Sequence, residues 1–256
     1  MTTPFHFDGY PRGVAEMLSH LSEANRLVGL HEEGIEQAVE AADIFKRLGG
    51  TLMQTRSLID LARLLHDDKQ LDAAEEAASR AIALIPEERQ GFQLCETRRL
   101  LGDIHQSKGE TEKAIHHDEV ALGIASPSNR HDSLFWIYYN LAELFRDEGR
   151  FDEAHARIER AKFHAVDSAY NLGRAMELEA SVWYKQRRFE EARFETLRAA
   201  DVYEKLGATQ NVERCGELLR RIEKGLNAPT SSGQSECNAD LSLQARSTGR
   251  LPRPLR

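Results

Sequence analysis

Apolar residues in this chain recur at the three- and four-residue steps of an α-helix. In the stretch 134–145 they are Leu134, Phe135, Tyr138, Leu141, Ala142 and Phe145. Gly149 follows, and glycine readily takes the left-handed conformation that ends a helix. A second apolar face then runs through Phe151, Ala154, Ile158 and Ala161. The pattern predicts two helices joined by a tight turn, packed closely where the side chains of Ala154 and Ala161 are small.

The same pattern returns every 40 residues. A leucine precedes a small residue at Leu21 and Ser22, Leu61 and Ala62, Leu101 and Gly102, and Leu141 and Ala142. Small residues follow 13 positions later (Gly34, Ala74, Ala114, Ala154) and again 7 positions beyond (Ala41, Ala81, Ala121, Ala161). The turn position, 8 residues after each leucine, holds Gly29, Lys69, Gly109 and Gly149. A fifth copy follows at a spacing of 38, with Glu179 in place of leucine and with Ala180, Phe189, Ala192 and Ala199. Such repetition predicts stacked structural units.

We therefore expect an all-α fold, an α-α superhelical solenoid of about five helical hairpins and a C-terminal capping helix. The predicted helix pairs are 13–27 with 31–47, 51–67 with 71–84, 88–108 with 111–125, 131–148 with 151–165 and 168–186 with 189–206, followed by a single helix at 209–225. This last helix is apolar on one side and charged on the other, as the end of a solenoid requires. We expect residues 1–12 to form a flexible leader, 13–226 the repeat array and 227–256 a disordered basic tail.

The repeat resembles the tetratricopeptide repeat (TPR). The resemblance rests on Leu followed by Gly or Ala, an aromatic residue, Gly, and then Phe or Leu before two alanines; the segments Asn140–Ala154 and Leu61–Pro86 carry it best. The usual repeat has about 34 residues, so the units of 40 have longer helices or links. These long units, and the segment Ala199–Gly207, resemble the arrays of fungal NLR-like (STAND) signalling ATPases and their stand-alone relatives. The resemblance implies a protein-binding scaffold.

Charge and composition narrow the classes of partner. The net charge is −8, and the segment from Asn227 onward carries +2, so the body of the chain is acidic. An acidic body disfavours nucleic acid, which binds clustered Lys and Arg. No run of about 18 apolar residues predicts a membrane span. The three cysteines are too few and too scattered to predict disulfides or a zinc site. We expect a cytoplasmic protein without membrane contact.

A search for catalytic motifs finds none. The sequence lacks a phosphate-binding loop, a Gly-x-Gly-x-x-Gly motif and a Gly-x-Ser-x-Gly elbow. His116 and His117 are adjacent, and neighbouring helix positions point about 100° apart, so they cannot clasp one ion alone. We expect no catalytic residues, no metal, no cofactor and no enzyme activity.

The family resemblance places candidate ligand-binding residues on the leading helices, which line a concave groove. They are Arg56, Ile59, Arg63, Arg99, Trp136, Tyr139, Arg146, Arg174, Tyr184 and Lys185. Aromatic residues and arginine dominate binding energy at protein interfaces. For Trp136 the alternative is packing between neighbouring hairpins. The Lys and Asn positions of a clamp for chaperone C-termini are not matched, since Ile59, Arg63, Arg99 and Asp103 stand there.

The sequence thus predicts a non-catalytic scaffold that binds a peptide or protein segment in the concave groove. One alternative is a sensor or regulatory module of a multi-component signalling ATPase system, whose nucleotide-binding loop would come from a partner chain. Another alternative is an enzyme with an unrecognised site between hairpins. The pattern leaves the oligomeric state open.

Overall fold

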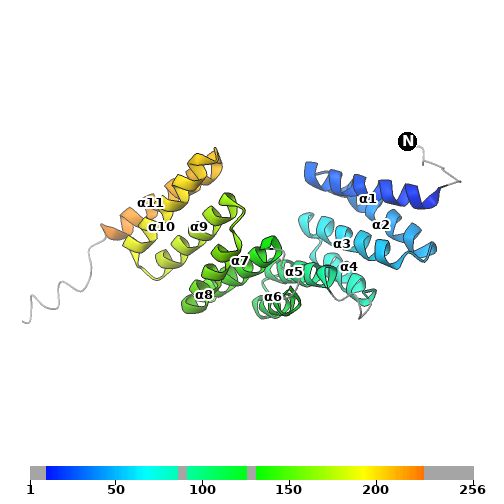
Figure 1. The fold of residues 1–256 in the computed structure, drawn as a ribbon, viewed down its shortest axis with the longest axis horizontal. Coiled ribbons are helices and arrows are strands. Elements are labelled where there is room, and N and C mark those ends of the chain that lie inside the picture. Colours follow the sequence, from blue (N-terminus) through cyan, green and yellow to red (C-terminus); the bar gives the residue numbers. More distant parts are fainter. Residues whose placement is uncertain (1–9, 86–90, 126–130, 228–256) are drawn as a thin grey trace, which may run out of the picture.

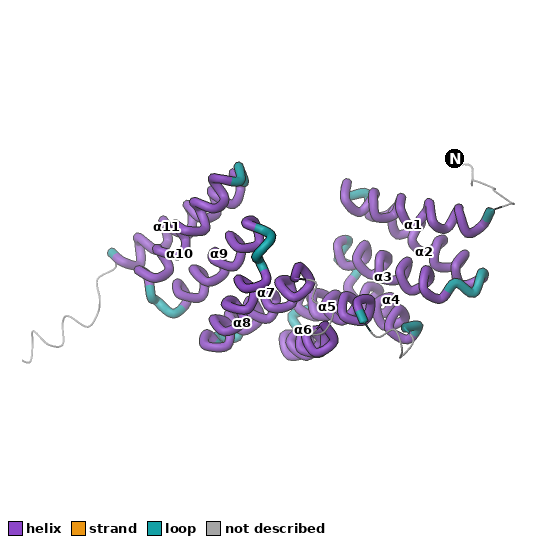
Figure 2. Tube along the Cα trace, viewed as in Figure 1, coloured by secondary structure: helices purple, strands orange, loops and turns teal. Residues whose placement is uncertain are grey.

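A computed structural model describes residues 10–85, 91–125 and 131–227, and it contains eleven helices in those ranges. They are α1 (Pro11–Val28), α2 (His31–Arg47), α3 (Thr51–Asp67), α4 (Leu71–Ala83), α5 (Phe92–Ser107), α6 (Thr111–Ala125), α7 (His131–Asp147), α8 (Phe151–His164), α9 (Ala169–Lys185), α10 (Phe189–Lys205) and α11 (Thr209–Leu226). The described residues form no strand. Successive helices pair as hairpins that stack into an arch (Figure 1; Figure 2).

The predicted hairpins are confirmed. Each predicted helix is present, and the largest boundary difference is at α5, which begins at Phe92 rather than at residue 88. The array starts at Pro11, two residues before the predicted position. The predicted leader and basic tail fall mainly on residues 1–9 and 228–256, which lie outside the described residues. Among the described helices, none combines the length and apolar character that a membrane crossing requires.

The turn inside each hairpin has the same backbone geometry in all five copies. Gly29, Gly109 and Gly149 have φ between 74° and 82°, and Lys69 and Arg187 occupy the same position with φ of 65° and 61°. The amide of the next residue then donates to a carbonyl five positions back, for example Gln70 N to Leu65 O at 2.8 Å. This is a Schellman cap, which satisfies the carbonyl groups that a helix end leaves open.

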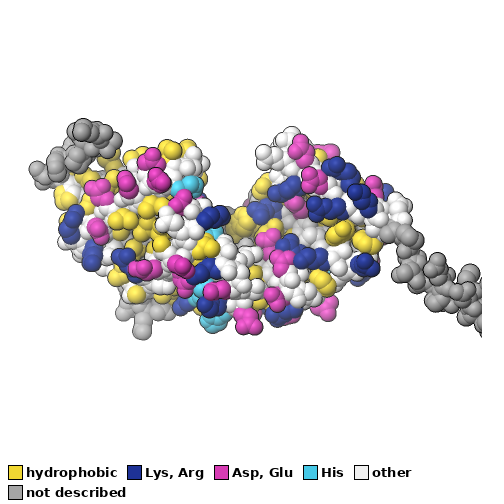
Figure 3. All heavy atoms as spheres, turned by 180° about the vertical axis from the view of Figure 1, so that it is seen from behind, with side chains coloured by type: hydrophobic (Ala, Val, Ile, Leu, Met, Phe, Trp, Pro, Cys, Tyr) yellow, Lys and Arg dark blue, Asp and Glu magenta, His cyan; other side chains and the backbone are white. Residues whose placement is uncertain are grey.

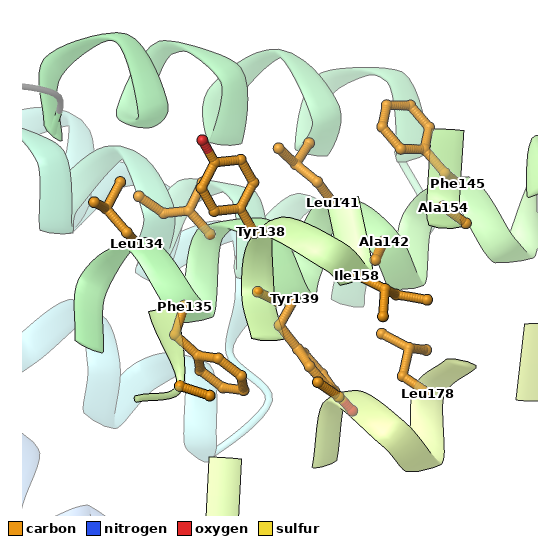
Figure 4. Packing of buried hydrophobic residues seen from close by; sticks show 14 of the residues in the cluster. Leu134, Phe135, Tyr138, Tyr139, Leu141, Ala142, Phe145, Ala154, Ile158 and Leu178 are labelled. Carbon is orange, nitrogen blue, oxygen red and sulfur yellow. The ribbon is translucent and has the colours of Figure 1, made fainter. Parts of the chain in front are cut away.

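Small residues lie where the two helices of a hairpin meet. Ala74, Ala114, Ala154 and Ala192 are each 0% exposed, which confirms the frame that the sequence pattern predicts. Larger side chains fill the space between hairpins, and the largest cluster surrounds α7 (Figure 4). Tyr138 and Tyr139 leave α7 in opposite directions in that view, so this helix buries two faces.

Candidate functional site

The leading helices of the hairpins form the inner side of the arch. Along the chain the backbones of α1 and α3, α3 and α5, α5 and α7, α7 and α9, and α9 and α11 approach each other closely. The backbones of the second helices of successive hairpins stay farther apart in the described part of the chain, where Arg157 of α8 reaches Glu119 of α6 through its side chain, at 3.7 Å. The array therefore curves with its leading helices inside. Seen from behind, the molecule is hollowed between its two ends, and positive and negative side chains interleave over the visible surface (Figure 3). The predicted binding residues all belong to these inner helices.

The N-terminal half of this inner side contains a hollow of about 600 Å³. Its walls come from α1, α3 and α5, and its lining residues are Glu16, Ser19, His20, Glu23, Met53, Arg56, Ile59, Asp60, Arg63, Phe92, Gln93 and Glu96. Three predicted residues, Arg56, Ile59 and Arg63, are among them. The sequence pattern did not predict the apolar lining residues Met53 and Phe92. Phe92 lies at the start of α5 and is 46% exposed.

Most inner-face arginines already have carboxylate partners. Arg63 lies 3.4 Å from Asp60 and 3.5 Å from Glu96, which belongs to the next leading helix. Arg99 pairs with Asp103 at 2.7 Å, and Asn140 Nδ2 donates to the same carboxylate at 2.6 Å. Burial nevertheless raises the pKa of Asp103. The contacts of Arg63 with Glu96 and of Asn140 with Asp103 join α3, α5 and α7, while Arg99 pairs with Glu96 and Asp103 within α5.

Arg56 differs from these arginines. It is exposed at the hollow, and no carboxylate of the described residues lies within 4 Å of it. Every carboxylate that lines the hollow has a partner: Glu16 pairs with Arg12, Glu23 with Arg26, Asp60 with Arg63, and Glu96 with Arg63 and Arg99. Arg56 therefore has no carboxylate of the described residues within 4 Å, although Glu23 and Asp60 lie near enough for its charge to act on the pKa of both.

The predicted aromatic anchors pack against one another and against an arginine. The Arg174 guanidinium lies 4.7 Å from the ring centroids of both Trp136 and Tyr139, a distance at which cation–π attraction is strong. Tyr139 is only 7% exposed, its hydroxyl donates to Glu143 at 3.4 Å, and burial raises its pKa. Trp136 packs beside the α7 core and is only partly buried. It therefore combines the two alternatives that the sequence left open, which are exposure in the groove and packing between hairpins.

Of the remaining predicted residues, Arg146 and Lys185 connect α7 to α9, and Tyr184 meets α10. Lys185 pairs with Asp147 at 2.8 Å, and Arg146 pairs with the same carboxylate at 3.0 Å. Arg146 Nη1 also donates to the Ser181 hydroxyl at 3.4 Å. The Tyr184 ring lies 5.8 Å from that of Phe189, at the beginning of α10. Ile59, in the other half of the array, is 6% exposed and belongs to the core. The structure thus divides the predicted set between two regions.

No group of three His, Cys, Asp or Glu side chains in the described ranges has the arrangement of a metal site. His117 stacks on His105 with ring centroids 5.0 Å apart. Its pKa is lowered to about 4, first by burial and then by the neighbouring charges of His105 and Arg98. His105 Nδ1 lies 2.7 Å from the Glu110 carboxylate. These contacts place the histidines in the packing between α5 and α6.

Sequence comparison finds the tetratricopeptide repeat family in residues 93–162, which span α5 to α8. No curated protein sequence matches the chain.

Similar solved structures extend the likeness over most of the array. BtubC (BKLC) from P. vanneervenii has a TM-score of 0.68 and 19% identity, with 88% of this chain and 95% of that chain covered. TPR-like repeats of a putative kinesin light chain from Podosopora anserina have a TM-score of 0.66 and 16% identity, covering 78% and 98%. A Rap protein complexed with Competence and Sporulation Factor has a TM-score of 0.61 and 15% identity, covering 84% of this chain and 65% of its own.

At such identities the likeness concerns the fold. The chain is an all-helical solenoid of TPR-like hairpins, as its sequence pattern predicts. Proteins of this fold are commonly interaction scaffolds. The resemblance to fungal NLR-like ATPases stays a prediction, because none of these comparisons bears on it.

Proposed function

We propose that this TPR-like solenoid is a non-catalytic scaffold that binds a peptide or protein segment on its concave face, with the N-terminal hollow as the principal contact. The observation that carries the proposal is Arg56, an exposed guanidinium without a carboxylate partner among the described residues, at a hollow of about 600 Å³. A cavity of that size accommodates a few side chains of a ligand.

The lining of the hollow indicates the chemistry of the segment. Its carboxylates are neutralised within the protein, so a basic ligand would have to displace existing pairs. An acidic side chain or a C-terminal carboxylate can instead form a two-pronged hydrogen bond with Arg56. Met53 and Phe92 supply apolar surface beside it. We therefore propose a ligand in which a carboxylate stands next to an apolar side chain.

The fold supports this use. The leading helices present side chains from successive repeats on one inner surface, which is how helical solenoids bind extended ligands. The Rap structure is a ligand complex of a protein with this fold. Trp136 and Arg174 extend the same inner surface toward the C-terminal half, where a longer ligand would meet an aromatic ring already paired with a cation.

Arg56 is the most direct residue to test, since Arg99 already pairs with the Asp103 carboxylate and Tyr139 already packs against Arg174 of the next repeat. We would select peptides from a displayed random library against the wild-type chain and measure their affinity by fluorescence polarisation. Arg56→Glu should weaken binding at least tenfold, as loss of a central charged contact does. The matched control is Arg80→Glu, which makes the same charge change at an exposed position on α4, outside the hollow.

Both variants should keep the wild-type helical circular dichroism, because both side chains are exposed. Selected peptides should be enriched in Asp or Glu next to apolar residues. The proposal is wrong if Arg80→Glu weakens binding while Arg56→Glu does not, or if the selected peptides are predominantly basic.

A further inference from the structure

The first helix of the array exposes an apolar stripe on its outer edge. The α1 stripe, as we name it, consists of Tyr10, directly before the helix, and of Val14, Met17, Leu21, Ala24 and Val28. Val14 is half-buried and also packs against the core of the first hairpin, whereas the other five residues are exposed. Met17 is 73% exposed and Val28 is 70% exposed, although both are apolar. In Figure 1, α1 stands at one end of the arch, and no other described helix covers its outer side.

The opposite end of the array is built differently. The exposed surface of α11 is mostly charged and polar: Thr209, Gln210, Glu213, Arg214, Glu217, Arg220, Arg221, Glu223 and Lys224. A helix with such an outer face is a cap that water solvates well. If one molecule stacked its α1 on the α11 of the next, these charged side chains would lose water against apolar ones, which is costly. Head-to-tail stacking is therefore disfavoured.

The positions on either side of the α1 stripe carry no Asp, Glu, Lys or Arg. The positions that flank it are Pro11, Gly13, Leu18, His20, Asn25 and Leu27. The charged residues of α1 lie on other faces of the helix and are in ion pairs: Arg12 with Glu16, and Arg26 with Glu23 and Asp67. The stripe and its borders can therefore lose water without leaving a charge unpaired. Leu27 is 71% exposed and widens the apolar surface.

The spacing of the stripe is symmetric. Its six positions are separated by 4, 3, 4, 3 and 4 residues, which is a heptad pattern centred on position 19. If two such helices run antiparallel about a two-fold axis at that centre, Tyr10 of one faces Val28 of the other. Val14 faces Ala24, and Met17 faces Leu21, in the same way. Each stripe residue then has an apolar partner, and each pair occurs twice, as two-fold symmetry requires.

We propose that the α1 stripe binds the α1 stripe of a second copy of this chain, in antiparallel orientation. The helix has 18 residues and is about 27 Å long. Contact along that length falls near the lower limit of specific interfaces, roughly 1,200 Å² in total. We therefore expect a dissociation constant on the order of micromolar. Most of the hollow's lining stays uncovered in this dimer, because Glu16, Ser19 and Glu23 line it from a different face of α1 and only His20 lies beside the stripe.

Sedimentation velocity over a range of concentrations tests the proposal with the full-length chain. The wild type should pass from monomer to dimer between about 1 and 100 µM, which brackets a micromolar constant. Met17→Glu should weaken dimerisation at least 100-fold, because it places a charge in the apolar contact. The control is Phe163→Glu, at a 64% exposed apolar position on α8, which should dimerise like the wild type.

Mixing two variants tests the orientation. Met17→Lys and Leu21→Glu should each be monomeric alone. Their equimolar mixture should form a heterodimer, because the antiparallel arrangement sets the introduced lysine opposite the introduced glutamate. A parallel arrangement would set position 17 opposite position 17 and would not bring the two charges together. Absence of a heterodimer overturns the antiparallel register.

Three results overturn the proposal as a whole. One is a wild-type monomer at 100 µM, and another is equal weakening by Phe163→Glu and Met17→Glu. The third is a monomer that becomes a dimer only when residues 2–9 are deleted, since the leader would then be the natural cover of the stripe.

Discussion

The carboxyl group of Asp118 on α6 points at the α-carbon of Gly102 on α5. A methyl group built on Gly102 would lie 2.6 Å from Asp118 Oδ1. Asp118 is 0% exposed, and neither of its carboxylate oxygens has a hydrogen-bond partner in the described residues. The equivalent positions of the other four repeats are also buried and hold Ala38, Ala78, Ile158 and Thr196. The third repeat therefore has an acid in its core where the others have small or apolar residues, and Gly102 provides the space for it.

Replacing this acid should stabilise the protein. Asp118→Ala removes a buried polar group without a partner, a feature that costs about 1–3 kcal/mol. We expect the free energy of unfolding in urea at pH 7 to rise by that amount. Asp152→Ala, at an exposed position on α8, is the control and should change stability by less than about 0.5 kcal/mol. A loss of stability in Asp118→Ala would mean that the carboxylate has a partner, such as buried water.

The effect of Gly102→Ala should depend on residue 118. In the wild type the new methyl group collides with the Asp118 carboxylate, and overpacking of this kind costs about 1–3 kcal/mol. In the Asp118→Ala background the space is free, and alanine gains about 1 kcal/mol over glycine inside a helix. A double-mutant cycle should therefore show a change of sign. Equal effects in both backgrounds would contradict the contact.

Asp118 should also make stability depend on pH. Burial, followed by the Asp103 charge, raises its pKa well above the usual value, and Arg99 opposes the shift. The folded chain thus keeps a proton that the unfolded chain releases above about pH 4. The unfolded state then binds fewer protons, so the free energy of unfolding falls as pH rises through this window.

Asp103 shifts in the same direction, so the comparison with Asp118→Ala isolates the contribution of Asp118. Urea titrations at several pH values between 4 and 8 give the free energy of unfolding as a function of pH. This free energy should fall more steeply with rising pH in the wild type than in Asp118→Ala. Parallel curves for the two proteins would mean that Asp118 has an ordinary pKa.

The turns at Lys69 and Arg187 should accept glycine with a gain in stability. Their φ values of 65° and 61° lie in the left-handed region, which costs a residue with a side chain about 1–2 kcal/mol. Part of the gain is lost because glycine makes the unfolded chain more flexible. We expect Lys69→Gly and Arg187→Gly each to raise the free energy of unfolding by about 0.5–1 kcal/mol. Gly149→Ala, at the equivalent turn, should lower it.

A charge in the seam of the third hairpin should unfold that repeat. Ala114 is 0% exposed between α5 and α6, so Ala114→Asp buries a carboxylate without a partner. We expect a loss of several kcal/mol, and hydrogen exchange should show the lost protection centred on α5 and α6, since a repeat depends mainly on its neighbours. Uniform protection along the array after this change would contradict the assigned packing.

The sequence alone determined the hairpins, their order and the residues in their seams. These features depend on residues that are close to one another in the sequence. They are the apolar residues spaced three and four positions apart, the small residue that lets two helices meet, and the glycine that ends a helix. A period of 40 residues, 38 before the fifth copy, repeats this local information, so Ala74, Ala114 and Ala154 could be placed without coordinates. The placement of the candidate binding residues on leading helices came from the resemblance to the tetratricopeptide repeat, applied copy by copy in the same frame.

Only the tertiary structure decided which of those residues are available to a ligand. Arg63 meets Glu96, Asn140 meets Asp103 and Lys185 meets Asp147 across 33 to 38 residues, and each contact depends on how one repeat is rotated against the next. The buried position of Tyr139, the unpaired position of Arg56 and the contact between Gly102 and Asp118 have the same origin. The sequence period predicts that repeats stack. The angle between stacked repeats comes from the packing of many side chains at once, and that angle decides which charged side chains meet.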